Sequence, residues 1–236
     1  LADYIQQQCF DKSSHHGDAR AGTGQLVGLV SPHIDPWRGA RCYGEAYGEL
    51  GKRLLTSTDT FVLFGTSHAP MRNAFALCRK AFETPLGLLQ ADNNAIDAIA
   101  GACDFDPYAD QLNHRREHSL EFQAVFLRHL LGDRPVKIIP ILAGLGDQQS
   151  TRESPLRTRS VERFLDAVRK VVDDQQAVVI AGADLAHVGP RFGDARAFDE
   201  GERDALGETD RESLDHAIRR DAEGFWHHVT GDIETR

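Results

Sequence analysis

The stretch GLVSPHIDPWRGA, residues 28–40, joins an apolar run to a turn rich in reactive side chains. The turn after a buried strand usually contains Gly, Asn or Ser, which adopt turn geometry at little cost. Here the turn places His33, whose imidazole can bind a metal or move a proton, soon after the apolar run. The stretch therefore predicts a buried strand that ends at a functional histidine.

Outward from this stretch, apolar runs alternate with helical patterns. We expect strands over residues 25–33, 60–68, 136–144 and 177–187, and helices over residues 39–55, 93–103, 117–132, 160–172, 210–220 and 223–229. Residues 72–87 look like a pair of shorter strands or an irregular excursion, and the polar, Gly-rich residues 11–24 look like a loop.

Short apolar strands that alternate with longer helices are typical of βαβ units. The parallel sheet of such a fold is buried on both faces, which explains strands that are apolar throughout rather than alternating. The pattern therefore predicts an α/β fold, a single domain over residues 1–236 with a mainly parallel central sheet flanked by helices.

Composition limits the possible partners and the compartment. A net charge of −9 argues against a surface for nucleic acid or anionic membranes. The four cysteines are scattered without a C-x-x-C pair, which indicates free thiols in a reducing compartment. The sequence has neither an apolar run of membrane-spanning length nor a signal-peptide pattern at its N-terminus. We therefore expect a cytoplasmic protein that binds neither nucleic acid nor membrane.

Three of the expected strands end in histidine: His33, His68 and His187. In open α/β sheets, ligands bind outside the carboxyl ends of the strands. Each histidine alone could simply satisfy turn carbonyls, but three together favour a shared site. Converging imidazoles suit a first-row metal, and an added carboxylate would give the ligand set of non-haem iron enzymes.

The stretch HRREHSLEF, residues 114–122, adds a further candidate group at the start of a helix. His118 and Glu121 share one helix face, so His118 is a general base or an extra ligand and Glu121 supports it from outside the ligand set. Arg115 and Arg116 would hold an anionic substrate. The structural alternative is a surface helix start with a salt-bridged turn.

Three further side chains are candidates near the strand ends. Asp184 either orients a histidine or binds backbone amides at the strand end. Asp35 and Trp37 lie in the turn after the first strand, and we assign them to substrate binding. Trp37 would line an aromatic wall or simply pack.

The motifs SPHIDPWRGA, FGTSH, HRREHSLEFQ, IIPILAG and AGADLAHVGPRFGD, in this order and spacing, resemble the Memo family, which includes AmmeMemoRadiSam system protein B. The resemblance covers about residues 25–230. It implies a fold similar to that of class III extradiol ring-cleaving dioxygenases, with a non-haem iron site, and partners from the AmmeMemoRadiSam system. The metal-site histidines of the family match His33, His68 and His118.

The sequence departs from the family pattern in two places. The turn that often reads P-H-A-G-Y in the family is PHIDPW here, and the cysteine of D-F-C-H in animal members is Ala186, in DLAH. Alanine cannot bind a metal, so a third ligand must be His118, His187, Asp184 or a residue that the pattern does not reveal. We also expect family members to continue past Arg236 into a further apolar strand.

Three functions follow as hypotheses. In the first, a divalent metal, Fe(II) before Cu or Zn, is held by His33 and His68 and acts with dioxygen on a small aromatic or oxygenated substrate, with His118 and His187 as catalytic candidates. In the second, the cleft binds a peptide or acidic ligand without catalysis, as the phosphopeptide binding described for animal members implies. In the third, the metal generates hydroxide for hydrolysis.

Overall fold

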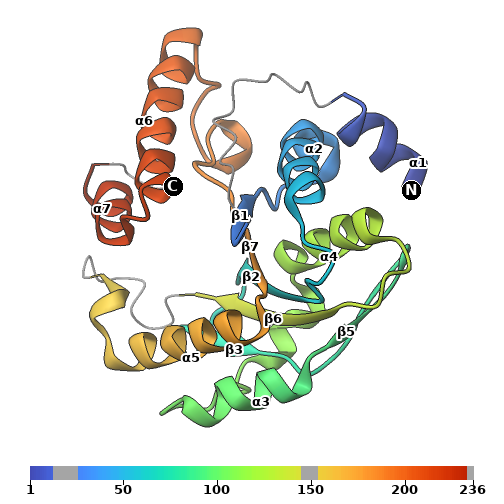
Figure 1. The fold of residues 1–236 in the computed structure, drawn as a ribbon. Coiled ribbons are helices and arrows are strands. Elements are labelled where there is room, and N and C mark those ends of the chain that lie inside the picture. Colours follow the sequence, from blue (N-terminus) through green and yellow to red (C-terminus); the bar gives the residue numbers. More distant parts are fainter. Residues whose placement is uncertain (13–25, 145–153, 233–236) are drawn as a thin grey trace. The chain divides into compact units, whose positions relative to one another are not determined.

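A computed structural model describes residues 1–12, 26–144 and 154–232 of the chain. As the sequence predicts, the fold is α/β with a mainly parallel sheet (Figure 1). The strand order is β1-β7-β2-β6-β5-β4, and β3 pairs with β6. The four pairings from β1 to β5 are parallel, whereas β4 and β3 are antiparallel to their partners. The strands are β1 (Gly28–Ser31), β2 (Thr60–Thr66), β3 (Phe75–Leu77), β4 (Phe82–Thr84), β5 (Gly87–Ala91), β6 (Lys137–Ala143) and β7 (Val178–Gly182).

Helices cover both faces of this sheet. Successive strand residues point to opposite sides, so an apolar strand presents an apolar surface on each face. Phe61 and Leu63 of β2 pack into one core with α2 (Pro36–Arg53) and α4 (His118–Leu131). Val62, between them, packs into the other core with α3 (Asn93–Ala102) and α5 (Arg159–Gln175) (Figure 1). The strands are therefore buried on both faces, which accounts for their continuously apolar sequence.

The turn after β1 doubles as the start of a helix. The side chain of Asp35 accepts a hydrogen bond from the backbone N–H of Arg38 at 3.2 Å and from its guanidinium at 2.5 Å. Pro36 occupies the first position of α2, where its missing N–H would have had no partner in the helix. Further along α2, the ring of Tyr43 stacks on Phe126 of α4 with centroids 4.1 Å apart. These contacts fix the direction in which the chain leaves β1.

Most expected elements are present, with one correction that bears on the site. The strand expected over residues 177–187 ends at Gly182, so His187 does not stand at a strand end. Asp184 instead lies two residues beyond the strand, the place that His33 and His68 occupy after β1 and β2. The N–H of Ala183 donates to the carbonyl of Ser31, the last residue of β1. Since β1 ends there, the chain after Ala183 has no strand of this sheet edge to pair with.

The remaining elements are short or lie near the ends of the described chain. The expected pair of short strands over residues 72–87 is present as β3 and β4, whereas β5 and the helical residues 2–10 were not expected. Most of the loop expected over residues 11–24 lies outside the described residues. The other helical segments are α1 (Ala2–Ile5), a π-helix (Gln6–Phe10), α6 (Glu200–Ile218), α7 (Ala222–His227), a π-helix (His228–Asp232) and 3-10 helices at Gln111–Arg116, Pro155–Arg157 and Pro190–Phe192.

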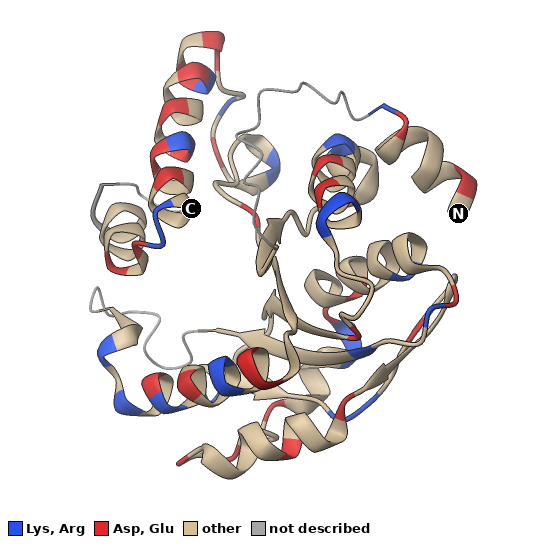
Figure 2. Ribbon diagram, in the orientation of Figure 1, with Lys and Arg blue, Asp and Glu red and all other residues tan. Residues whose placement is uncertain are grey.

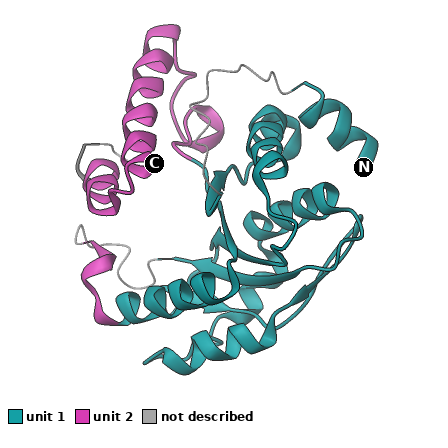
Figure 3. Cartoon of the chain, in the orientation of Figure 1, with its two compact units in different colours: residues 1–149, 160–184 teal, residues 150–159, 185–236 magenta. Residues whose placement is uncertain are grey.

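The chain divides into two compact units (Figure 3). The first unit, residues 1–149 and 160–184, contains the whole sheet. The second unit, residues 150–159 and 185–236, contains α6 and α7. That one domain spans residues 1–236 stays a prediction from the sequence.

Charged side chains are concentrated on helices rather than strands. Figure 2 shows Lys, Arg, Asp and Glu along α5 and α6, while the central strands carry few of them. In α6, Asp199 and Glu202 form a reciprocal capping box at the first turn. Across the described ranges, none of the helices has the length and apolar character needed to cross a membrane.

Candidate metal centre

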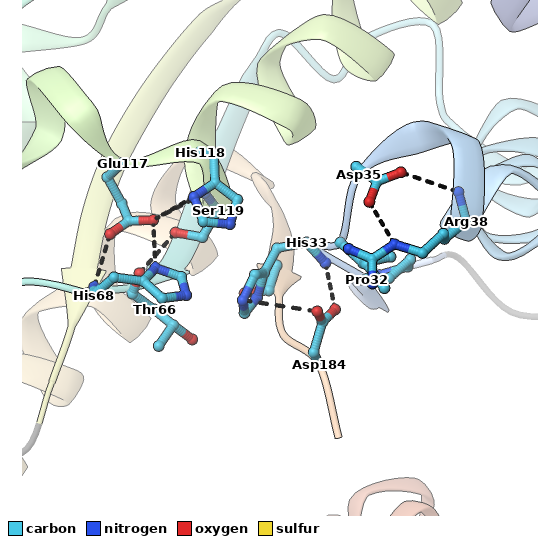
Figure 4. A network of polar contacts seen from close by, with 12 residues as sticks. Pro32, His33, Asp35, Arg38, Thr66, His68, Glu117, His118, Ser119 and Asp184 are labelled. Carbon is cyan, nitrogen blue, oxygen red and sulfur yellow. Dashed lines mark hydrogen bonds and ion pairs between the residues drawn. The ribbon is translucent and has the colours of Figure 1, made fainter. Parts of the chain in front are cut away.

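Three histidines from separate elements meet at the carboxyl end of the sheet. His33 lies two residues after β1, His68 lies two residues after β2, and His118 is the first residue of α4. One nitrogen can be chosen from each ring so that the three nitrogens all lie within 4.8 Å of one another. The ring centroids are 5.1 Å apart for His33 and His68, 5.6 Å for His33 and His118, and 4.6 Å for His68 and His118 (Figure 4).

The parallel register brings these rings to one edge. Gly182, at the end of β7, pairs with Ser31 of β1 on one side and with Gly65 of β2 on the other. The strands therefore end at the same level, and the residues that follow them emerge side by side. His33 and His68 share the site because β7 holds their two strands in register.

Two glycines let α4 approach this edge closely enough for His118 to join. A Cβ on Gly182 would lie 2.5 Å from the carbonyl oxygen of Ser119, and one on Gly65 would lie 2.5 Å from the Ser119 hydroxyl. That hydroxyl donates to the carbonyl of Thr66 at 2.8 Å. The first turn of α4 thus rests directly on the ends of β2 and β7, and this contact places the His118 ring beside His68.

The buried carboxylate of Glu117 lies behind two of the rings. It accepts hydrogen bonds from the backbone N–H of His68 at 2.8 Å and from the backbone N–H of Ser119 at 3.1 Å, and its Oε1 lies 2.8 Å from Nδ1 of His68 (Figure 4). Its Oε1 also lies 3.6 Å from Nδ1 of His118. Burial raises the pKa of Glu117, but these hydrogen bonds outweigh burial and hold the pKa below its usual range. The group is therefore a carboxylate with several N–H partners.

His33 is the buried member of the group and is held by the side chain of Asp184 and the backbone carbonyl of Gly182. Its amide donates to Oδ1 of Asp184 at 2.7 Å, and its ring Nδ1 lies 3.2 Å from the carbonyl oxygen of Gly182. Burial lowers the pKa of His33, so the neutral imidazole is favoured. Because a carbonyl oxygen can only accept, Nδ1 carries the proton and the lone pair is on Nε2.

A second group of hydrogen bonds supports the loop that carries His33. The amide of Gln123, on α4, donates to the carbonyl of Pro32 at 2.9 Å, and Tyr47 donates to the Gln123 side chain at 2.9 Å. Tyr43 donates to the carbonyl of Ile34 at 2.9 Å. Both tyrosines and Gln123 are buried, so the loop is anchored from the core side.

The donor set fits a divalent metal ion. Imidazole nitrogens are ligands for Zn, Cu, Fe and Ni, and they bind in the neutral form. The side chains of His68 and His118 are 48% and 44% exposed, whereas His33 is buried. A metal held here would be anchored on the protein side and open on the other. Asp184 is not part of the three-histidine group, although its Oδ2 lies 3.9 Å from Nε2 of His33.

Comparison with known proteins places this chain in a family. Residues 3–234 match the family model described as Memo-like protein. The chain belongs to the Memo family. Memo relatives include a MEMO1 family protein of Aquifex aeolicus, 32% identical over 178 residues, which cover 75% of this chain and 44% of the relative.

Two further Memo relatives show the same partial coverage. A protein of Thermus thermophilus is 30% identical over 70% of this chain and 45% of its own length, and one of Methanosarcina mazei is 28% identical over 86% and 65%. The chain thus spans about half to two thirds of the length of these relatives. Membership extends over the elements that carry His33, His68 and His118.

Other residues predicted for the site of this Memo protein lie around the three-histidine group or on the surface. Arg115 and Arg116 are exposed in the 3-10 helix that leads to His118. Trp37 is 79% exposed, with its ring 4.6 Å from that of Tyr4, and Asp35 is occupied as the cap of α2. Their roles in substrate binding stay predictions.

The carboxylate expected beside His118 is Glu117, which precedes it in the sequence, and not Glu121. Glu121 is exposed on α4, whereas Glu117 is the buried carboxylate beside His118. The side chain of Glu117 also accepts from the Ser119 amide and so caps α4. A carboxylate in the cap position before a histidine was the sequence signal for this role, and helix periodicity alone does not reveal it.

His187 and Ala186 belong to the second unit. The ring of His187 lies edge-on to Phe192 with centroids 5.0 Å apart, and Ala186 is exposed. The catalytic role predicted for His187 stays a prediction.

Proposed function

We propose that this Memo protein is a metal-dependent oxidoreductase whose divalent metal, Fe(II), is held by His33, His68 and His118. The observation that carries the proposal is that three histidines, from the ends of two strands and the start of a helix, each bring one ring nitrogen within 4.8 Å of the other two. His118 then supplies the third ligand that Ala186 cannot. The likeness of the Memo fold to extradiol dioxygenases supports iron before copper or zinc.

The residues of this chain would each serve such a site in a defined way. When bound, Fe(II) would supply redox chemistry with dioxygen. His33 would anchor the ion from the buried side, and the half-exposed side chains of His68 and His118 would leave room for a small aromatic or oxygenated substrate. Arg115 and Arg116 would attract an anionic substrate to the same helix start. This assignment makes His118 a ligand, so the proton acceptor is another group.

A metal-dependent hydrolase is the second candidate, and one observation favours it. Among the described residues, the group contains three imidazoles and no carboxylate. Three histidines are the ligand set of zinc sites that activate water, whereas the common non-haem iron site has two histidines and one carboxylate.

Metal analysis tests the proposal first. We expect anaerobically purified protein to contain about one equivalent of metal, and His33→Ala, His68→Ala and His118→Ala each to lose it. His129→Gln is the matched control, because His129 lies on α4 about 16 Å along the helix from His118. Metal content that is unchanged in the three alanine variants would overturn the proposed site.

Activity then separates the candidate functions. The iron form should take up oxygen with members of a phenolic panel, whereas ester hydrolysis by the zinc form alone would favour the hydrolase. If neither form turns over, a non-catalytic binding module for a peptide or another ligand is favoured.

We further propose a reducing, cytoplasmic setting, since all four cysteines are free thiols. Partners from the AmmeMemoRadiSam system are a proposal that co-purification would test.

A further inference from the structure

We infer that Glu117 is a positioning residue that fixes the tautomer and orientation of His68 and so aims its Nε2 at the metal. The metal part of this inference rests on the proposed function. The tautomer is a property of the protein alone, so the two parts can be tested separately.

The contacts of Glu117 join two segments that are far apart in the sequence. Its Oε2 accepts from the backbone N–H of His68, and its Oε1 is in contact with both the His68 ring and the backbone N–H of Ser119. One carboxylate thereby ties the turn after β2 to the first turn of α4. The side chain is only 4% exposed, so water does not compete effectively for these bonds.

The acceptor character of Glu117 decides the tautomer. An ionised carboxylate has no proton to donate, so a nitrogen 2.8 Å from its oxygen must be the donor. Nδ1 of His68 therefore carries the hydrogen, and the lone pair is on Nε2. Histidine ligands of metals are typically oriented by such a bond from the other ring nitrogen.

The same oxygen of Glu117 also faces the second exposed ring. Nδ1 of His118 lies 3.6 Å from Oε1, and the His118 ring stacks on His68 with an interplanar angle of 26°. Both rings thus turn the Nδ1 edge toward Glu117. His33 does not depend on Glu117, because its Nδ1 faces the carbonyl of Gly182 instead. A change at Glu117 should therefore affect His68 most and His33 least.

Nitrogen-15 NMR of the imidazole rings in metal-free protein tests the inference at pH 8.5. We expect His68, assigned with a His68→Gln variant, to show a protonated Nδ1 and an unprotonated Nε2. In Glu117→Gln, where an amide N–H₂ replaces one acceptor oxygen, the Nε2–H form of His68 should appear. Glu121→Gln removes the same charge from the exposed position one turn further along α4 and should leave the His68 spectrum unchanged.

Metal affinity provides the second measurement, by titration with Zn²⁺ and Fe²⁺. Loss of the support to a histidine ligand typically weakens binding by about 10–100-fold, which we expect for Glu117→Gln and not for Glu121→Gln. A wild-type His68 with Nε2 protonated would overturn the inference, and this measurement does not depend on whether Glu117→Gln folds. A His68 tautomer that is the same in Glu117→Gln would overturn it too. Wild-type protein with the expected tautomer but no metal binding would instead refute the proposed function.

Discussion

The backbone N–H of His33 donates a hydrogen bond of 2.7 Å to Oδ1 of Asp184, a residue 151 positions further along the chain. The bond joins the turn after β1 to the turn after β7, two strands that are paired in parallel. The side chain of Asp184 therefore acts on the backbone of His33, and the position of the His33 ring follows from it.

Asp184→Ala should destabilise the protein by about 1–3 kcal/mol, because the buried N–H of His33 would lose its acceptor. Asp184→Asn keeps an oxygen that can accept this bond, so it should lose less. Urea unfolding of the three proteins measures the difference. Equal losses for the two variants would show that the charge of Asp184, and not its hydrogen bond to His33, stabilises the fold.

Gly182→Ala should destabilise the protein by about 1–3 kcal/mol, since overpacking forces neighbouring groups to move. The added methyl would lie 2.5 Å from the carbonyl oxygen of Ser119 and push the first turn of α4 away from the sheet. Gly48→Ala, in α2, is the opposite control: nothing lies within 4 Å of the new methyl, and the helix should gain about 0.5–1 kcal/mol. Thermal unfolding of both variants should give shifts of opposite sign.

Metal should stabilise the folded protein by mass action, and removal of His118 should abolish the effect. At a free metal concentration of about 100 times Kd, the wild-type free energy of unfolding should rise by about 2.7 kcal/mol. His118→Ala should show little rise at the same concentration, whereas His129→Gln should behave like the wild type. A full metal-dependent rise in His118→Ala would mean that His118 is not a ligand.

His114 should make stability depend on pH. Burial lowers its pKa from 6.5 to about 4 in the folded protein, so the unfolded chain binds a proton more readily between these values. The stability that the buried, neutral His114 contributes to the folded protein is fully present above about pH 6.5 and is lost as the pH falls toward 4. The shift corresponds to about 3 kcal/mol.

His114→Leu supplies the measurement for this prediction, because it removes the titrating group. Urea unfolding between pH 7.5 and 4.5 should show a smaller loss of stability in His114→Leu than in the wild type. Parallel curves for the two proteins would contradict the assignment, whatever their difference at neutral pH.

One rule predicts much of the fold and the meeting of two of the three histidines, His33 and His68, from the sequence. Continuous apolar runs identify β1, β2, β6 and β7, and parallel strands must end at a common edge, so residues just past those runs meet. His33 and His68 satisfy this rule. His118 is visible as a histidine at the start of an amphipathic helix, although only the close contact of that helix with Gly65 and Gly182 brings it to the edge.

The remaining features depend on contacts that no local pattern carries. The run AVVIAGADLAH continues with mostly apolar residues beyond the end of β7. It therefore predicts a strand that ends at His187, whereas the pairing of β7 ends at Gly182. Glu117 reaches a residue 49 positions away, so its role depends on tertiary placement. Glu121 matched the helical spacing to His118, yet its side chain points to solvent.

The register of β1 against β7 also determines when the histidine group can assemble. Residues 28–31 pair with residues 179–182, which are separated from them by about 150 positions in the sequence. Such distant pairings form slowly because a long loop must first be closed. Until that pairing exists, His33 has neither the Gly182 carbonyl nor the Asp184 carboxylate to hold it. If the three histidines bind a metal, that metal cannot template the early steps of folding, and we expect its uptake during refolding to follow the slowest phase.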